Sequence, residues 1–270
     1  MLIDTHCHLD AVEFDADRDL VALQALQQGV STIVIPAVAR ANFDSVIALC
    51  QQHQHCAYAL GIHPIYVDSA AADDIETLKH TIAHNDPVAI GEIGLDYFVK
   101  NAKEHPENRQ RQTYFFTEQL KMAKQYHLPV ILHVRHAIDD VLKYLRHYEV
   151  NGGIAHAFNG SFQQAEQFIA LGFKLGFGGA MTYSRALKIR ELARNLPLES
   201  IVLETDAPDI PPEWIGRSGR NSPLELIKIA QVLADLRQLE LTQVLDITSA
   251  NALKALPKLA DLYTSPHVVH

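Results

Sequence analysis

Short apolar runs alternate with longer amphipathic segments along the whole chain. Runs such as 32–35 (Thr-Ile-Val-Ile) and 129–132 (Pro-Val-Ile-Leu) do not alternate with polar residues, which is typical of strands buried on both faces of a parallel sheet. The pattern predicts eight strands, at residues 2–5, 32–36, 57–61, 88–91, 130–133, 153–156, 173–177 and 201–204. Segments with helical periodicity follow, at residues 16–28, 41–53, 73–84, 108–126, 137–147, 161–171, 185–195, 223–239 and 241–255.

Eight strand–helix units with no Ser- or Gly-rich linker between them predict an α/β protein, a single-domain (β/α)8 TIM barrel. An open, doubly wound parallel sheet is the structural alternative. We expect the barrel domain at residues 1–263 and a flexible tail at 264–270. The clearest helix start is at 222–225, where an N-cap serine, a proline at the first helical position and a glutamate at the third predict a capping box.

Composition and charge narrow the class of protein. A hydrophobic fraction of 48% with 20% charged residues allows a large core and excludes a disordered chain. The net charge of −9 disfavours binding of long nucleic acid over a broad surface, because such binding neutralises many phosphates with lysine and arginine. The odd number of cysteines, three, implies no disulfide framework. Because the chain shows neither a signal-peptide pattern nor a membrane-length apolar run, we expect a cytoplasmic protein without membrane association or an obligate protein partner.

The fifteen histidines direct attention to 4–8 (Asp-Thr-His-Cys-His), at the end of the first predicted strand. Residues i and i+2 of a strand share a face and lie about 6.5–7 Å apart. His6 and His8 therefore point the same way and can converge on one cation, while Cys7 points oppositely. Two packed histidines would give the same pattern, so the positions of further candidate ligands decide between the two interpretations.

Those further candidates all stand at the carboxyl ends of predicted strands. Glu92 follows the fourth strand, His133 ends the fifth, His156 ends the sixth and Asp206 lies at the end of the eighth. Active sites of (β/α)8 barrels are built at this end, which we call the mouth. A polar residue that closes an apolar strand costs stability unless it is paired or ligated, and six at one mouth are hard to explain as core residues. The predicted metal ligands are His6, His8, Glu92, His133, His156 and Asp206.

The ligand types indicate a hydrolase with two metal ions. Four imidazoles and two carboxylates are too many for one tetrahedral zinc and suit two divalent ions. Glu92 is best placed to bridge them, because Gly91 and Gly94 leave room around it. A water shared by two cations becomes a nucleophile at neutral pH. We expect Glu92 and Asp206 to be catalytic, with Asp206 able to accept the proton of that water.

Four motifs carry a resemblance to a known family. They are 4–10 (DTHCHLD), 61–64 (GIHP), 91–96 (GEIGLD) and 204–208 (ETDAP). In this order they resemble the TatD family of metal-dependent deoxyribonucleases, in the amidohydrolase-like barrel superfamily, over nearly the whole chain. The segments 178–183 (GGAMTY) and 206–211 (DAPDIP) look most like its YjjV-like branch. The resemblance implies a (β/α)8 barrel, a two-metal site formed by the six predicted ligands, and phosphodiester hydrolysis with Mg²⁺ or Mn²⁺; Zn²⁺ or Ni²⁺ can also occupy such sites.

Two positions beside predicted ligands depart from the common family pattern. His136 stands where many members have an acidic residue, and Ala157 stands where a cysteine often follows the histidine. We expect these differences to affect substrate preference rather than metal binding.

Two further carboxylates share a face with predicted ligands. Glu204 lies two residues before Asp206, and Asp96 follows Glu92 by four residues. We expect both to orient ligands, because side chains that ligate metals are themselves held by hydrogen bonds, and a buried polar role is the alternative for Glu204.

The expected substrate-binding residues are His63, Arg135, Arg217 and Arg220. His63 ends the third strand and faces the same mouth, where it can contact a substrate phosphate or orient a ligand. The arginines can clamp phosphate with two parallel hydrogen bonds, although a solvated surface position fits each of them nearly as well.

The sequence thus predicts a TatD-type deoxyribonuclease that cleaves single-stranded or frayed DNA ends. One alternative keeps the site but changes the substrate to a small phosphoester, lactone or amide, since a fold does not fix its function. Another alternative is a non-catalytic metal-binding or interaction protein. The complete ligand set argues against that alternative.

Overall fold

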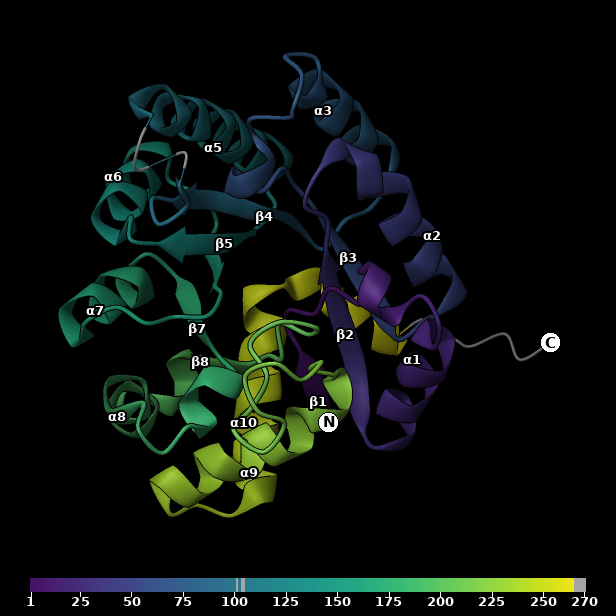
Figure 1. The fold of residues 1–270 in the computed structure, drawn as a ribbon, viewed down its shortest axis with the longest axis vertical. Helices are drawn as coiled ribbons and strands as arrows, with labels where there is room; N and C mark the ends of the chain where they lie inside the picture. The colour runs from purple at the N-terminus through teal and green to yellow at the C-terminus, as the bar shows by residue number, and fades with distance from the viewer. Residues whose placement is uncertain (101, 103–104, 265–270) are drawn as a thin grey trace.

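The computed structural model describes residues 1–100, 102 and 105–264 and contains eight parallel strands in sequence order (Figure 1). The strands are β1 (Leu2–Asp4), β2 (Val30–Pro36), β3 (Cys56–Leu60), β4 (Ala89–Asp96), β5 (Val130–Arg135), β6 (Gly153–Ala155), β7 (Phe173–Phe177) and β8 (Ile201–Leu203). Backbone hydrogen bonds from Thr5 to Leu203 (3.1 Å) and from Asp206 to His6 (2.8 Å) bring the last strand against the first. The predicted (β/α)8 barrel is confirmed, and the open-sheet alternative is wrong.

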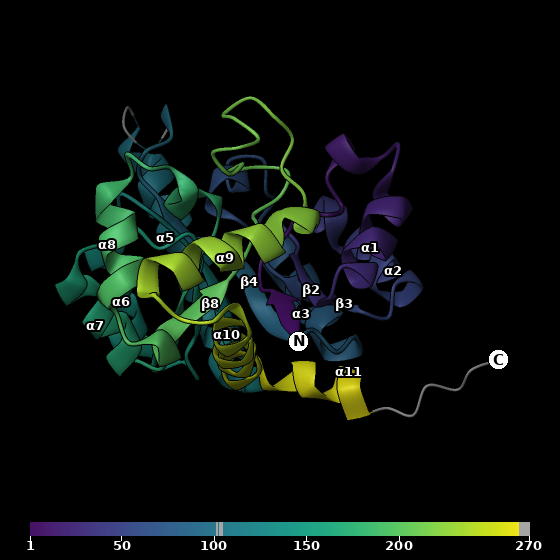
Figure 2. The same cartoon turned by 90° about the horizontal axis from the view of Figure 1, so that it is seen from below.

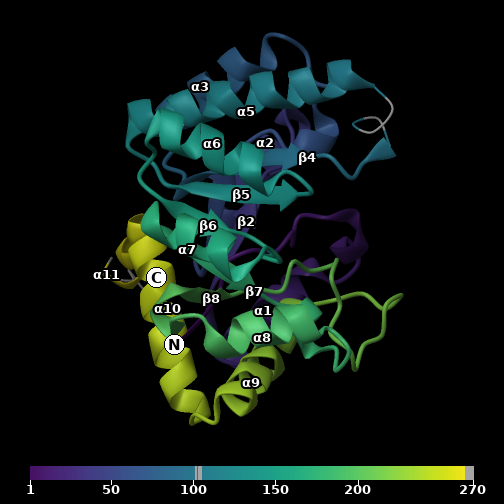
Figure 3. The same cartoon turned by 90° about the vertical axis from the view of Figure 1, so that its left-hand side faces the viewer.

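Helices surround the strands on the outside (Figures 1 and 3). They are α1 (Arg18–Gln27), α2 (Phe43–Gln52), α3 (Asp74–His84), α5 (Pro106–Tyr126), α6 (Ile138–Tyr148), α7 (Phe162–Ala170), α8 (Leu187–Asn195), α9 (Leu226–Arg237), α10 (Leu241–Ala255) and α11 (Asp261–Thr264). Each predicted helix overlaps one of these, but α11 was not predicted. Thr264 ends α11, and the rest of the predicted tail, 265–270, lies outside the described residues.

Strand β4 is longer than predicted. The sequence pattern ends it at Gly91, whereas β4 continues to Asp96, with a register shift against β5 between Ile90 and Ile93. All residues of β4 are buried, including Glu92 and Asp96. In the sequence, a carboxylate after an apolar run looks the same whether it lies inside the strand or just beyond its end. The sequence pattern therefore predicted the end of β4 too early.

The predicted capping box at 222–225 is also wrong in part. Ser222 is an N-cap, but its hydroxyl accepts from the N–H of Leu224 (3.3 Å) and caps a 3-10 turn, Pro223–Glu225, before α9 begins. The Glu225 carboxylate instead accepts from the indole N–H of Trp214 (2.6 Å). A tertiary partner has therefore replaced the local contact that the sequence suggests.

One end of the barrel is closed by apolar packing. Inward-facing Ile3, Val34, Ile131 and Val202 pack with residues of α10 that lie across the end where the strands begin (Figure 2). A second apolar layer packs the outer face of the strands against the surrounding helices. No described helix is long and apolar enough to cross a membrane. Polar side chains gather at the opposite end, where the strands finish.

Candidate metal centre

A cavity of about 1040 Å³ opens at the mouth of the barrel. Five of the six predicted ligands line it, and the sixth, His6, is fully buried. The segment that carries Asp206 connects β8 to α9 and rises above the barrel on this side (Figure 2). The order of strands in the fold thus brings together residues that lie up to 200 positions apart in the sequence.

His6 and His8 point to the same side, as strand geometry predicts. Their Nε2 atoms lie 3.2 Å apart, and the Oε2 atom of Glu92 lies 3.1 Å from the first and 3.4 Å from the second. The Oδ1 atom of Asp206 lies 3.5 and 3.7 Å from the same two nitrogens. Cys7, between the histidines, is fully buried and directs its thiol to the carbonyl of Ala207.

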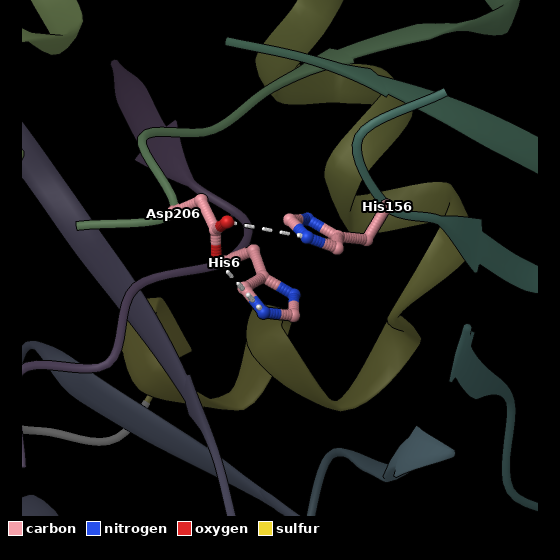
Figure 4. Close-up of side chains that lie close together, drawn as sticks. All are labelled: His6, His156 and Asp206. Carbon is pink, nitrogen blue, oxygen red and sulfur yellow. Dashed lines mark ion pairs between the residues drawn. The ribbon is translucent and has the colours of Figure 1, made fainter. Parts of the chain in front are cut away.

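Glu92 and Asp206 each face two groups of histidines. The second oxygen of Glu92, Oε1, lies 3.0 Å from Nδ1 of His133, on the side away from His6. Asp206 lies between His6 and His156, with Oδ2 placed 3.6 Å from Nε2 of His156 (Figure 4). A carboxylate with one oxygen on each of two ligand groups has the arrangement required of a bridging ligand.

These separations fit divalent cations. Two ligand atoms bound to one ion at about 2.1 Å and at roughly tetrahedral or octahedral angles lie about 3.0–3.4 Å apart. The candidate donors lie 3.0–3.7 Å apart. Three groups have ligand atoms within 4.8 Å of one another: His6, His156 and Asp206; His6, His8 and Glu92; and His63, Glu92 and His133.

The charges of the carboxylates favour cation binding. Burial raises the pKa of Glu92, but the charges of His63 and His6 and hydrogen bonds from the histidines outweigh it and hold the pKa well below its usual range. For Asp206, burial is likewise outweighed by His156, and its pKa is lowered. Burial lowers the pKa of His8, but the hydrogen bond and charge of Glu92 outweigh it and raise that pKa to about 9. Both carboxylates are therefore ionised at neutral pH and need positive charge beside them.

His63 is placed as a hydrogen-bond donor rather than as a ligand. Its Nδ1 accepts from the backbone N–H of Ile65 (3.1 Å), so in the neutral ring the proton is on Nε2. Nε2 lies 3.3 Å from Oε1 of Glu92. Burial lowers the pKa of His63 to about 4, which keeps the ring neutral at neutral pH.

Two carboxylates lie against predicted ligand histidines on the side away from the predicted metal site, as expected. Oδ2 of Asp96 lies 3.0 Å from Nε2 of His133. Oε1 of Glu204 lies 2.9 Å from Nδ1 of His156 and also accepts from the N–H of Ala157 (2.7 Å). Each histidine thus has one nitrogen beside Asp96 or Glu204 and the other facing Glu92 or Asp206.

The three arginines expected to bind substrate differ in position. Arg135 lines the cavity, whereas Arg217 and Arg220 do not. The guanidinium of Arg220 donates two hydrogen bonds of 2.7 Å to Asp17 and one of 2.8 Å to the carbonyl of Glu13. Arg220 therefore joins the segment after β8 to the segment before α1. The guanidinium of Arg217 lies 5.9 Å from the ring of Tyr183.

Sequence reasoning missed the residue that fixes the turn of Asp206. Asn221 is fully buried, and its amide nitrogen faces the carbonyl oxygens of Thr205, Asp209 and Ile210 at 2.7, 2.9 and 3.3 Å. Its side-chain oxygen accepts from the N–H of Ser222 (2.8 Å). An asparagine in a polar loop gives no sequence signal for such a role.

Two glutamines of α5 hold the mouth from outside the barrel. The Gln119 amide accepts from the N–H of Ile62 (2.7 Å) and donates to its carbonyl (3.1 Å). Gln112 makes the same pair of bonds to Asp96, at 2.8 and 2.9 Å. Their spacing of seven residues, which puts both on one helix face, was a signal that could have identified them.

A (β/α)8 barrel with histidines and carboxylates gathered at its mouth defines the class of metal-dependent barrel hydrolases. The chain belongs to the TatD family: the family model described as TatD related DNase matches residues 3–257. It is 41% identical over 240 residues to the Escherichia coli K12 protein named uncharacterized metal-dependent hydrolase YjjV, covering 87% of this chain and 90% of that protein.

Other relatives agree with this assignment. The human protein named deoxyribonuclease TATDN3 is 30% identical over 270 residues, covering 97% of this chain and 96% of the relative. The crystal structure of E. coli YjjV, described as a TatD homologue, superposes with a TM-score of 0.89 at 38% identity and covers 95% of this chain and 98% of that one. The chain is thus a metal-dependent hydrolase of the TatD family, and its similarity to YjjV agrees with the motifs at 178–183 and 206–211.

Proposed function

We propose that this hydrolase is a deoxyribonuclease that cleaves phosphodiester bonds at single-stranded or frayed DNA ends. The observation that carries the proposal is Glu92, whose two oxygens face two separate histidine groups. Such a carboxylate is suited to a pair of divalent ions, and paired ions are suited to phosphodiester hydrolysis. The family description and the name of the human relative support DNA as the substrate.

The six predicted ligands would together hold two ions. Glu92 faces His6 and His8 with one oxygen and His133 with the other, and Asp206 lies beside His6 and His156. Mg²⁺ or Mn²⁺ suits activity, and Zn²⁺ or Ni²⁺ also suits these ligands. When bound, the ions supply an acidified water and stabilise negative charge on the phosphate.

Two side chains have roles toward the substrate. Asp206 is 13% exposed and ionised, so it can accept the proton of the attacking water as the bond from phosphorus to the leaving oxygen breaks. His63 lines the same cavity, and its Nε2–H, which lies beside Oε1 of Glu92, can be shared with a non-bridging phosphate oxygen. Asp96 and Glu204 keep His133 and His156 oriented.

The cavity wall favours a strand end over a duplex lying across the surface. Asp10, Glu13 and Asp209 line the cavity around the ligands. Acidic walls repel extended phosphate backbone, whereas bound ions attract the one phosphate that reaches the floor.

We also propose that the protein works in the cytoplasm. Its three cysteines are free and buried, and burial raises the pKa of Cys56 to about 12. Unreactive thiols without disulfides are typical of reducing compartments.

The test uses metal-stripped protein, labelled single-stranded DNA, and added Mg²⁺ or Mn²⁺. We expect cleavage only with metal, and a loss of at least about 100-fold in kcat for Asp206→Asn. Metal content, measured by mass spectrometry, should stay close to that of the wild type in this variant. Turnover of a small phosphoester, lactone or amide without any DNA cleavage would refute the nuclease and support the alternative substrate class.

A further inference from the structure

The cavity has one fixed positive side chain in an acidic wall. Among the described residues that line it, Arg135 is the only arginine or lysine. The carboxylates that line it are Asp10, Glu13, Glu92, Asp96, Glu204, Asp206 and Asp209. An anionic chain that enters this cavity therefore has two favourable places for phosphate, the metal ligands and Arg135.

Arg135 is held in position by an aromatic ring. It ends β5 two residues after His133, so both residues lie on the same face of the strand. Its guanidinium carbon lies 3.9 Å from the centroid of the Phe98 ring. No carboxylate of the described part of the chain forms an ion pair with Arg135. Stacking fixes the plane of the guanidinium and leaves its N–H donors available at the edge.

The backbone that carries the ring is tied to the candidate metal centre. Oδ1 of Asp96 accepts from the backbone N–H groups of Phe98 (2.8 Å) and Val99 (3.2 Å). Oδ2 of the same carboxylate lies 3.0 Å from the predicted ligand His133. One side chain thus contacts both the backbone of Phe98 and the predicted ligand His133.

We propose that Arg135, stacked on Phe98, binds the phosphate next to the scissile one. The substrate strand then leaves the metal centre over the β4–β5 side of the mouth. Arg135 is a substrate-binding residue in this proposal, and Phe98 is a positioning residue that acts through it. The proposal rests on the proposed nuclease function and specifies its substrate as a chain with at least two phosphates.

Two substrates with the same scissile bond separate the roles of the two phosphates. Thymidylyl-thymidine has one phosphodiester and no neighbouring phosphate, whereas an oligothymidylate has both. We expect Arg135→Met to lower kcat/KM for the oligonucleotide about 10- to 100-fold, the range for a lost charged hydrogen-bond pair, and to leave the dinucleotide unchanged. Phe98→Leu should raise KM for the oligonucleotide with little change in kcat, and Phe98→Tyr should restore it.

Matched controls exist in the chain. Phe162 has the same exposed fraction as Phe98, 39%, but it lies in α7 and is not the ring on which Arg135 stacks, so Phe162→Leu should have no effect. Arg146→Met, in the last turn of α6, makes the same change of charge away from the cavity.

A chemical change in the substrate tests the contact directly. A single uncharged methylphosphonate at the linkage next to the terminal one, prepared for either end of the strand, removes the neighbouring phosphate charge. For one of the two oligonucleotides, we expect the wild type to lose as much kcat/KM as Arg135→Met loses. Combining both changes should give no further loss, since interacting groups are not additive.

The outcomes are distinguishable. Equal losses of Arg135→Met on both substrates would place Arg135 at the scissile phosphate and overturn this inference while the nuclease stands. Additive losses from the variant and the methylphosphonate, or unchanged activity of Arg135→Met, would also overturn it. If the wild type cleaves neither substrate, the proposed function itself fails.

Discussion

Replacing Asn221 by aspartate should destabilise the turn that carries Asp206, although the two side chains have nearly the same shape. The Asn221 amide nitrogen donates toward three carbonyl oxygens at 2.7, 2.9 and 3.3 Å and is fully buried. An aspartate oxygen in the same place must bind a proton to avoid facing those carbonyls as an anion.

The expected loss of stability follows from that proton. Raising the pKa of the new carboxyl from about 4 to above 7 costs roughly 4 kcal/mol at pH 7, at about 1.4 kcal/mol per unit. The amide has two hydrogens to donate, whereas the protonated carboxyl has one. The hydrogen bond that is lost adds roughly 1 kcal/mol to the destabilisation. Asn221→Asp should therefore lower the free energy of unfolding by about 5 kcal/mol at pH 7.

The sign of the pH dependence is fixed. The folded variant has the higher pKa, so the unfolded state binds fewer protons and stability relative to the wild type falls as pH rises. The difference should shrink to about 1 kcal/mol below pH 4, where both states hold the proton.

Urea denaturation of Asn221→Asp and wild type, followed by circular dichroism at pH 4 and pH 7, measures the difference. Asn195→Asp, at an exposed position in the last turn of α8, is the matched control and should change little at either pH. An equal loss at both pH values, or a loss below about 1 kcal/mol at pH 7, would refute the role of the amide as a donor.

Three other variants test the supports of the site. Glu204→Gln should weaken metal affinity about 10- to 100-fold, because Glu204 holds His156; calorimetric titration with Mn²⁺ checks this, and wild-type affinity would contradict it. Gly94→Ala should lower stability by about 3 kcal/mol or more in urea, since its φ is +150° and a Cβ would overlap the carbonyl of His133; stability equal to the wild type would refute the clash. Asn251→Leu removes donors to the carbonyls of Leu198 and Ile201, both at 2.8 Å, at the closed end. This variant should lower the free energy of unfolding by about 2–3 kcal/mol and leave the metal affinity unchanged. Weaker metal binding would contradict the view that the closed end of the barrel contributes to stability and only the mouth to chemistry.

The barrel and the meeting of the predicted ligands were predictable because each of these residues stands at or near the carboxyl end of an apolar run. His133 and His156 end runs that read as buried strands, and sequence order places parallel strand ends at one mouth. Glu92 was placed correctly at the mouth even though β4 extends four residues past it. Periodicity cannot separate a loop residue from a strand residue whose carboxylate faces a polar cavity.

The sequence alone could not predict the roles of residues whose partners lie far along the chain. Arg135 and Arg220 looked equally suited to phosphate until the fold paired Arg220 with Asp17, 203 residues away, and placed Arg135 in the cavity. The role of His63 depends on a backbone N–H that fixes its proton on Nε2. Such roles can be assigned only from the folded structure, because each residue type allows several partners and the fold selects one of them.

If this hydrolase binds ions and a DNA end as proposed, the shared carboxylate of Asp96 connects metal loading with strand binding. One of its oxygens holds His133 and the other holds the backbone of Phe98, so a restraint applied at either neighbour reaches the other through a single side chain. Linkage then requires that, if bound ions improve the affinity for a DNA end, the DNA end improves the affinity for ions by the same factor. With such a coupling, the hydrolase would retain its ions most tightly while a substrate is bound.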